Sequence, residues 1–181
     1  TDKLFIAQSG VAPTTPEDRG VGRPKFSTTA SSFTMSDNQN ELIVPLVWNG
    51  PNGITIEKRL KFTRDSYLIS VDQTIINGRE TPWSGKIFGQ LKRTPPESEG
   101  GFLTGAQSFT GAVYSTPENR YQKVEFDEIE DGEFGQKQSK GGWVAMIQHY
   151  FLAAWVPPQE NDITFYASSK SKPSYIAGYI T

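Results

Sequence analysis

The clearest hydrophobic pattern in the chain is an alternation between residues 54 and 62. Four apolar side chains occupy even positions there, at Ile54, Ile56, Leu60 and Phe62. The odd positions from Glu57 to Lys61 are charged. Side chains two residues apart in a strand point to the same face of a sheet. The pattern therefore predicts a strand with one face buried and the other in solvent.

The segments on either side extend this strand into a meander. A short apolar run from Glu41 to Trp48 precedes a strong turn signal at Asn49–Gly53. After a tight connection at Arg64 and Asp65, apolar and polar side chains alternate again from Tyr67 to Thr74. Antiparallel sheets with one solvated face produce such alternation. We therefore expect three antiparallel strands in succession.

The second half of the chain holds weaker signals. A further strand is predicted from Gly85 to Lys92, and its internal Gly89 indicates a bulge or a close approach of another group to the backbone. Tyr121 to Ile129 is another candidate strand. Asp127 to Gly135 is acidic and contains glycine, which is typical of a solvated loop.

The longest apolar run, Lys140 to Pro157, has a polar break at Gln148-His149. It is too short to cross a bilayer, which requires about 18 consecutive apolar residues, so we expect it to be buried inside the protein. One helical face is conceivable, but two core strands, Trp143 to Ile147 and Phe151 to Val156, fit its β-branched and aromatic content equally well. The neighbouring meander favours the strands.

Composition supports an all-β domain. Aromatic residues make up 12% of the 181 residues, and there are 17 glycines and 12 prolines. The net charge of −2 gives no basic footprint for nucleic acid or for an anionic membrane surface. The absence of cysteine excludes a disulfide framework and thiolate chemistry. With one histidine besides, a zinc site is improbable and no cofactor is predicted.

The chain is predicted to form one domain over residues 1–181, with a long surface loop at residues 11–33. That stretch is rich in Pro, Gly, Ser and Thr and cannot bury enough apolar area to offset its ordering entropy. The chain begins without Met and ends inside a strand-like pattern, which indicates a fragment of a longer protein.

Candidate chemistry is sparse. His149 is the only histidine and the only candidate base near neutral pH, but a lone histidine among apolar neighbours is more often structural. Trp83 follows a proline and is expected in a loop with partial burial, although an exposed tryptophan could stack on a sugar. Carboxylates at Glu125, Asp127 and Glu128 lie in the acidic stretch, and sequence alone does not place any two of them across a cleft.

Five colinear motifs carry a resemblance to a known family. They are Asn40–Pro45, Phe88–Lys92, Gly111–Pro117, Tyr121–Phe126 and Ser139–Pro157. From about Asn38 onward the chain closely resembles the large periplasmic domain of the YidC membrane protein insertases. The stretch before it does not carry the resemblance.

The resemblance implies an all-β fold, a twisted antiparallel β-supersandwich similar to the galactose mutarotase fold, with few short helices. Compared with the family's domain, the first strands, the last strand and its linker helix are expected to be absent. It also implies a place on the periplasmic side of the Gram-negative inner membrane, in a multi-pass parent that assists insertion and folding of membrane proteins. The parent would act alone or with the Sec translocon, and insertion itself would belong to its membrane core.

Two functions remain open under this resemblance. The first is a non-catalytic docking module for the Sec translocon and its SecDF-type accessory proteins, with nascent membrane proteins reached through the parent. Its candidate surface lies within Gly105 to Val156, at Tyr114, Tyr121, Phe126 and Glu128. The alternative is a carbohydrate-binding or mutarotase-like protein with a cleft at Trp83, His149 and Tyr150. A single histidine cannot supply the pair that enzymes of that type use.

Overall fold

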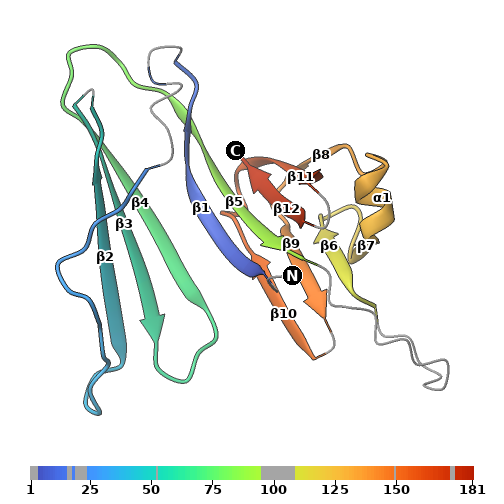
Figure 1. The fold of residues 1–181 in the computed structure, drawn as a ribbon, viewed down its shortest axis with the longest axis horizontal. Coiled ribbons are helices and arrows are strands. Elements are labelled where there is room, and N and C mark those ends of the chain that lie inside the picture. The colour runs from blue at the N-terminus through green and yellow to red at the C-terminus, as the bar shows by residue number, and fades with distance from the viewer. Residues whose placement is uncertain are drawn as a thin grey trace. The chain divides into compact units, whose positions relative to one another are not determined.

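The computed structural model describes residues 4–15, 18, 24–51, 53–94, 109–148, 150–171 and 174–181. The chain divides into two compact units, which are described separately below (Figure 1). The first unit comprises Thr1–Ala12 and Lys86–Thr181, and the second comprises Pro13–Gly85. Strands predominate in both units, in agreement with the all-β prediction, and the strand pairs whose residue register is defined are antiparallel.

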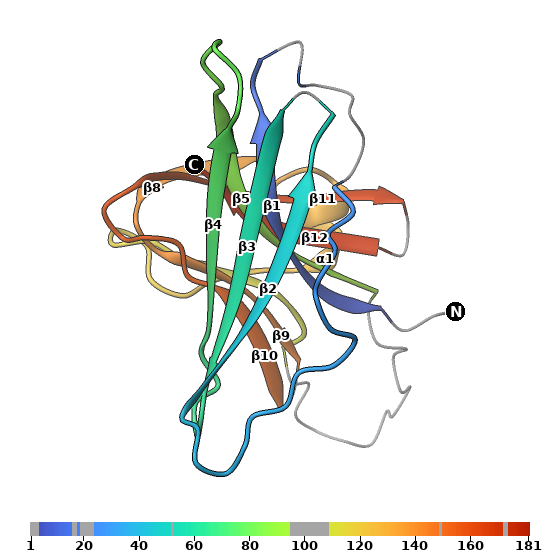
Figure 2. The ribbon, with the colours of Figure 1, turned by 90° about the vertical axis from the view of Figure 1, so that its left-hand side faces the viewer.

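The second unit contains the predicted meander. Strands β2 (Glu41–Asn49), β3 (Ile54–Thr63) and β4 (Ile69–Asn77) pair in chain order and lie side by side in Figure 2. Ile54 and Ile56 are buried, whereas Arg59 is exposed, which confirms the alternation along β3. The pattern did not predict Lys58, which is buried on the apolar face with its Nζ 4.7 Å from the centre of the Phe26 ring. Burial lowers the pKa of Lys58.

The start of β4 differs from the prediction. The strand begins at Ile69, so Tyr67 lies in the connection before it and is fully exposed. The turn at Asp65 has a left-handed backbone, with φ of 58°, and Ser66 Oγ accepts a hydrogen bond from the backbone N–H of Leu68 at 3.1 Å. These local bonds delay the start of the strand beyond Tyr67.

The two ends of the second unit are joined by hydrogen bonds. The backbone N–H of Thr14 donates to the carbonyl oxygen of Ser84 at 3.0 Å. The hydroxyl oxygens of the same two residues lie 2.6 Å apart. The predicted surface loop at residues 11–33 is shorter than expected, because β1 continues to Pro13. Among the described residues from 24 to 33, one β-bridge pairs Ser27 with Val47.

Two sheets form the first unit. The five-stranded sheet has the order β1 (Phe5–Pro13), β5 (Gly85–Arg93), β12 (Ser174–Ile180), β11 (Asp162–Ser171) and β8 (Gln136–Lys140). The four-stranded sheet has the order β10 (Phe151–Trp155), β9 (Trp143–Gln148), β6 (Gly111–Ser115) and β7 (Gln122–Val124). One hydrophobic core takes side chains from both sheets, so the first unit is a sandwich.

The core of the first unit is centred on large, fully buried side chains. Phe165 and Met146 are completely inaccessible to solvent, and Leu91 is nearly so. Gly89 lies on the core face, where a Cβ would come within 2.9 Å of the Trp155 ring. The sequence predicted a bulge or a close approach at this glycine, and the close approach is confirmed.

The apolar run of Lys140–Pro157 forms a hairpin. β9 and β10 pair antiparallel, with Gln148 opposite Phe151 and Trp155 opposite Val144. This confirms the two-strand interpretation over the helix. His149 lies outside the described residues. Burial was predicted for both strands, but only β9 supplies fully buried side chains, since β10 is at the edge of its sheet.

The strand predicted from Tyr121 to Ile129 is wrong over most of its length. β7 covers only Gln122–Val124, and the short helix α1 (Phe126–Glu130) follows at once. A capping box starts this helix, because Glu125 and Glu128 exchange side-chain and backbone hydrogen bonds. The acidic stretch Asp127–Gly135 is therefore part helix and part turn rather than loop throughout.

A row of polar side chains crosses the five-stranded sheet. Gln90 Nε2 donates to Gln8 Oε1 at 2.8 Å, and the Tyr166 hydroxyl donates to Gln90 Oε1 at 2.8 Å. Gly178 lies between Gln90 and Tyr166 in the register and leaves room for the tyrosine side chain to reach across. Burial, with a smaller contribution from Tyr179, raises the pKa of Tyr166 to about 12.

Candidate docking surface

The chain between β6 and β8 concentrates negative charge on the first unit. Residues 118–133 contain seven acidic and two basic side chains, a net charge of −5, against −2 for the whole chain. Five of the carboxylates are exposed, those of Glu118, Glu125, Asp127, Asp131 and Glu133. None of these five forms an ion pair with any residue in the part of the chain that the structure describes.

Tyr121 lies within this acidic stretch and is its most exposed aromatic side chain. A turn precedes it, in which the backbone N–H of Asn119 donates to Thr116 Oγ1 at 2.9 Å. Tyr121 itself has φ of 56°, a left-handed conformation that is uncommon for a residue with a side chain. Its side chain is 53% exposed, and its ring meets the Trp143 ring edge-on at 6.4 Å between centroids. We call Tyr121 and the five exposed carboxylates the Tyr121 surface.

Tyr114 and Phe126, predicted as docking residues, pack against the core. The Tyr114 ring contacts Phe134 edge-on at 5.1 Å between centroids and lies 6.4 Å from Phe165. The Phe126 ring lies 4.5 Å from that of Tyr175. Both side chains are half-buried. Their observed contacts fix the elements that carry the Tyr121 surface, and their role in docking stays a prediction.

Glu128, the fourth predicted docking residue, has a capping role in α1. Its Oε2 accepts the backbone N–H of Glu125 at 2.6 Å, and its own backbone N–H donates to Asp127 Oδ1 at 3.0 Å. A carboxylate at this position also interacts favourably with the positive end of the helix. Glu128 therefore holds α1 in place, and a contact with a partner stays a prediction.

A buried tyrosine links α1 to the five-stranded sheet. The Tyr175 hydroxyl donates to Glu130 Oε1. Burial, this hydrogen bond and the negative charges of Glu130 and Asp127 raise the pKa of Tyr175 to about 12. The pKa of Tyr175 therefore reports the negative electrostatic potential beside the Tyr121 surface.

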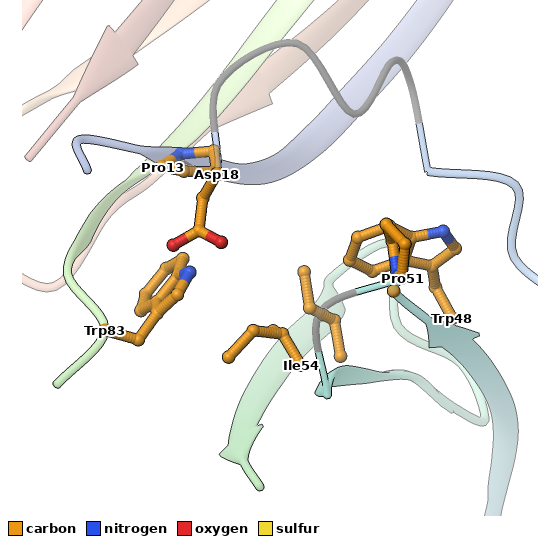
Figure 3. Close-up of a pocket in the computed structure, with 8 residues that line it drawn as sticks. Pro13, Asp18, Trp48, Pro51, Ile54 and Trp83 are labelled. Carbon is orange, nitrogen blue, oxygen red and sulfur yellow. The ribbon is translucent and has the colours of Figure 1, made fainter. Parts of the chain in front are cut away.

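The residues predicted for a sugar cleft do not form a common site within either unit. Trp83 lies in a loop of the second unit and Tyr150 is an exposed turn residue of the first, whereas His149 lies outside the described residues. Trp83 lines a cavity of about 20 Å³ in the second unit, which has room for a single water molecule. Figure 3 shows Trp48 and Trp83 at this cavity with the carboxylate of Asp18.

Asp18 is already engaged by a cation. Its two carboxylate oxygens accept hydrogen bonds from Arg79 Nη1 and Nη2, each at 3.0 Å, in a bidentate pair. The Thr15 hydroxyl donates to Asp18 Oδ2 at 2.5 Å. Such a pair is an element of structure rather than an acid or base at a sugar ring, so the alternative function gains no support here.

Two features escaped the sequence patterns. Arg93 is 3% exposed, on the core side of β5, and its Nη2 donates to Gln148 Oε1 at 2.5 Å. Phe151 and Leu152, read as members of a core strand, are 73% and 67% exposed. The signal that could have located the exposed pair is its position beside the polar break of the hairpin, where strands leave the core.

Comparison with known proteins identifies the family. The model of the YidC periplasmic domain matches residues 1–181. The chain belongs to this family. Relatives named membrane protein insertase YidC include those of Nitrosococcus oceani, 41% identical over 97% of this chain, and Saccharophagus degradans, 38% identical over 98%. The chain spans about a third of their length, with 31% of each covered.

The family assignment agrees with the rest of the structure. Both the periplasmic-domain resemblance read from the sequence and the all-β architecture are confirmed. Among the residues that the structure describes, no helix is long and apolar enough to span a membrane. Within the same residues, no group of three or more His, Cys, Asp or Glu side chains could hold a metal ion.

Proposed function

We propose that this chain is the periplasmic, non-catalytic docking domain of an inner-membrane protein insertase that assists the insertion and folding of membrane proteins. Family membership carries the insertase part of this proposal, because the model of the YidC periplasmic domain matches the whole chain. The relatives are named insertases rather than enzymes of sugar metabolism. Insertion itself would be performed by other parts of the parent.

The Tyr121 surface supports the docking part. Interfaces between proteins are commonly anchored by tyrosine or tryptophan, and complementary charge guides the encounter. The Tyr121 ring contacts Trp143, and this contact would reduce the side-chain entropy lost on binding. The net charge of −5 over residues 118–133, in which Arg120 and Lys123 are the basic members, favours a partner that presents Lys or Arg. We assign this role to a basic periplasmic segment of the Sec translocon or its SecDF-type accessory proteins.

Site-specific photocrosslinking tests this assignment. A photoreactive amino acid at Tyr121 of the full-length parent should capture a Sec component in membranes. The matched control is the same probe at Tyr67, a fully exposed tyrosine of the second unit. Adducts at position 121 that contain only proteins from outside the Sec system would overturn the Sec assignment. Equal capture of every neighbour at both positions would overturn docking at this surface.

A further inference from the structure

Among the described residues of the first unit, those at the tip of the β9–β10 hairpin form its most exposed apolar feature. It consists of Tyr150, Phe151 and Leu152, which we call the hairpin tip. Tyr150 is 83% exposed, and the two residues after it are 73% and 67% exposed. Figure 1 shows β9 and β10 side by side as one hairpin.

The hairpin tip extends beyond the sandwich core. Consecutive residues of a strand point to opposite faces of the sheet. Phe151 and Leu152 are consecutive and both are exposed, so neither face of the sheet is covered at this end of β10. Farther along the hairpin, Ala153 is half-buried and Trp155 packs against the core. Ala154 and Val156 on the other face stay exposed, so both faces of β10 are exposed together only at the tip.

The hairpin tip has a firm base. Behind it, Arg93 donates to the carbonyl oxygen of Ile147 at 3.5 Å and to Gln148 Oε1 at 2.5 Å. The Arg93 guanidinium also lies 5.0 Å from the centre of the Phe5 ring. These contacts fix the last residues of β9, which pair with Phe151 and Leu152 in β10. The apolar side chains of Phe151 and Leu152 thus lie on a strand that pairs with the held end of β9.

The hairpin itself contains no Asp, Glu, Lys or Arg in residues 141–159, and Arg93 at its base is already buried. The arms of the hairpin can therefore enter a medium of low polarity without desolvating one of these ions. Tyrosine beside phenylalanine and leucine is the composition found where proteins meet the boundary between lipid headgroups and acyl chains. A tip that exposes apolar side chains on both faces of its strand matches a lipid layer better than a protein groove that covers one face.

We propose that the hairpin tip inserts into the interfacial layer of the bilayer beside which the parent holds this domain. The proposal rests on the membrane location given under the proposed function, but not on the Tyr121 surface. Three partly inserted side chains bind weakly on their own. A parent anchored in the same membrane makes the contact intramolecular and so raises its occupancy.

The absence of cysteine allows a direct test. A single cysteine in place of Leu152 carries an environment-sensitive fluorophore, and Glu118→Cys, an exposed polar position of the same unit, is the control. The labelled chain is tethered through a histidine tag at either terminus to vesicles of phosphatidylethanolamine and phosphatidylglycerol with a nickel-chelating lipid. The fluorophore at position 152 should shift to the blue and be quenched several-fold by spin-labelled lipid, whereas the fluorophore at position 118 should do neither.

The result that overturns the proposal is a label at position 152 that stays as water-exposed as the control with both tethers. A second experiment uses chains without a fluorophore, so that the native side chains of the hairpin tip are tested. Phe151→Ser with Leu152→Ser should lower vesicle partitioning of the untagged chain at least threefold, whereas Ile43→Ser, an exposed apolar position of the second unit, should leave it unchanged. An unchanged partitioning of the tip variant contradicts the proposal. Crosslinking at Tyr121 reads out the proposed docking separately.

Discussion

The Tyr121 surface and the hairpin tip both expose aromatic side chains on the first unit, yet they differ in charge. Residues 118–133, which include Tyr121, have a net charge of −5, whereas residues 141–159, which include the hairpin tip, contain no Asp, Glu, Lys or Arg. An exposed aromatic side chain alone does not identify a partner. The ions around it decide whether attraction depends on charge and salt or on the removal of apolar area from water.

The largest expected effect is a loss of stability after a substitution in the core of the first unit, which supports both the Tyr121 surface and the hairpin tip. Phe165→Ala should lower the free energy of unfolding by about 3–5 kcal/mol, because it empties a fully buried site between the two sheets. Phe151→Ala is the matched control, and it should change stability by no more than about 0.5 kcal/mol since the ring is exposed. Urea unfolding of the two variants provides the measurement. Equal losses would mean that the hairpin tip is packed in solution.

A high salt concentration should weaken binding at the Tyr121 surface but not at the hairpin tip. Raising the salt concentration from about 0.1 M to about 1 M shortens the screening length from about 10 Å to about 3 Å. Capture of a basic partner by a photoreactive group at Tyr121 should then fall by about tenfold, or about 1.4 kcal/mol. Quenching of a fluorophore at Leu152 by spin-labelled lipid should not decrease. If salt weakens both signals alike, the contrast in charge does not govern the partners.

Removing the capping carboxylate should have a smaller effect. Glu128→Ala should lower stability by about 1 kcal/mol, because the Glu125 backbone N–H loses its acceptor at the start of α1. Glu118→Ala removes an equally negative but exposed group and should change stability by no more than about 0.5 kcal/mol. Thermal unfolding compares the two. A normal stability of Glu128→Ala with lost partner capture would instead favour a direct contact with the partner.

A further effect concerns alkaline titration. Tyr166 and Tyr175 have pKa values raised from 10 to about 12 in the folded protein. Because the folded pKa is the higher one, the stability that each tyrosine contributes is present below pH 10 and is lost between about pH 10 and pH 12. Ultraviolet absorbance should show tyrosines that ionise late, and Tyr175→Phe should remove one of them.

Asp127→Asn sharpens the same measurement. Its charge is the smallest of the stated contributions to the raised pKa of Tyr175, so neutralising it should lower that pKa slightly. Tyr166 lies on the polar row of the five-stranded sheet, where burial is the main cause, and should not respond. A shift of both tyrosines would indicate a general loosening of the fold.

The sequence predicted those elements whose residues repeat at a regular spacing. The alternation in β3 and the paired strands of residues 140–157 follow directly from the period of two in a sheet. The capping box of α1 stands in the sequence, but five helical residues are too few for a 3.6-residue period to emerge. Tyr121 was named from the sequence as a docking candidate, which stays a prediction, whereas its left-handed backbone depends on the turn before it.

Burial was harder to predict than strand formation. β9 and β10 have similar apolar content, and only their order in the sheet makes one central and the other an edge. For the same reason Phe151 and Leu152 were read as core. Arg93 shows the converse, since a charged side chain on β5 is buried beside Phe5 and Gln148, which lie far from it in the sequence. Neighbours brought together by topology cannot be read from a local pattern.

The hydrogen bonds that join Thr14 to Ser84 have a consequence for the order of folding. They bring together the ends of a 73-residue unit that separates β1 from its neighbour β5. β1 is synthesised before β5. At ordinary rates of translation, synthesis of the intervening unit takes roughly 4–15 s, and β1 cannot pair with β5 before then. During that time its edge is open to other extended chains. Early formation of the β2–β4 meander would shorten the distance that β1 must search for β5.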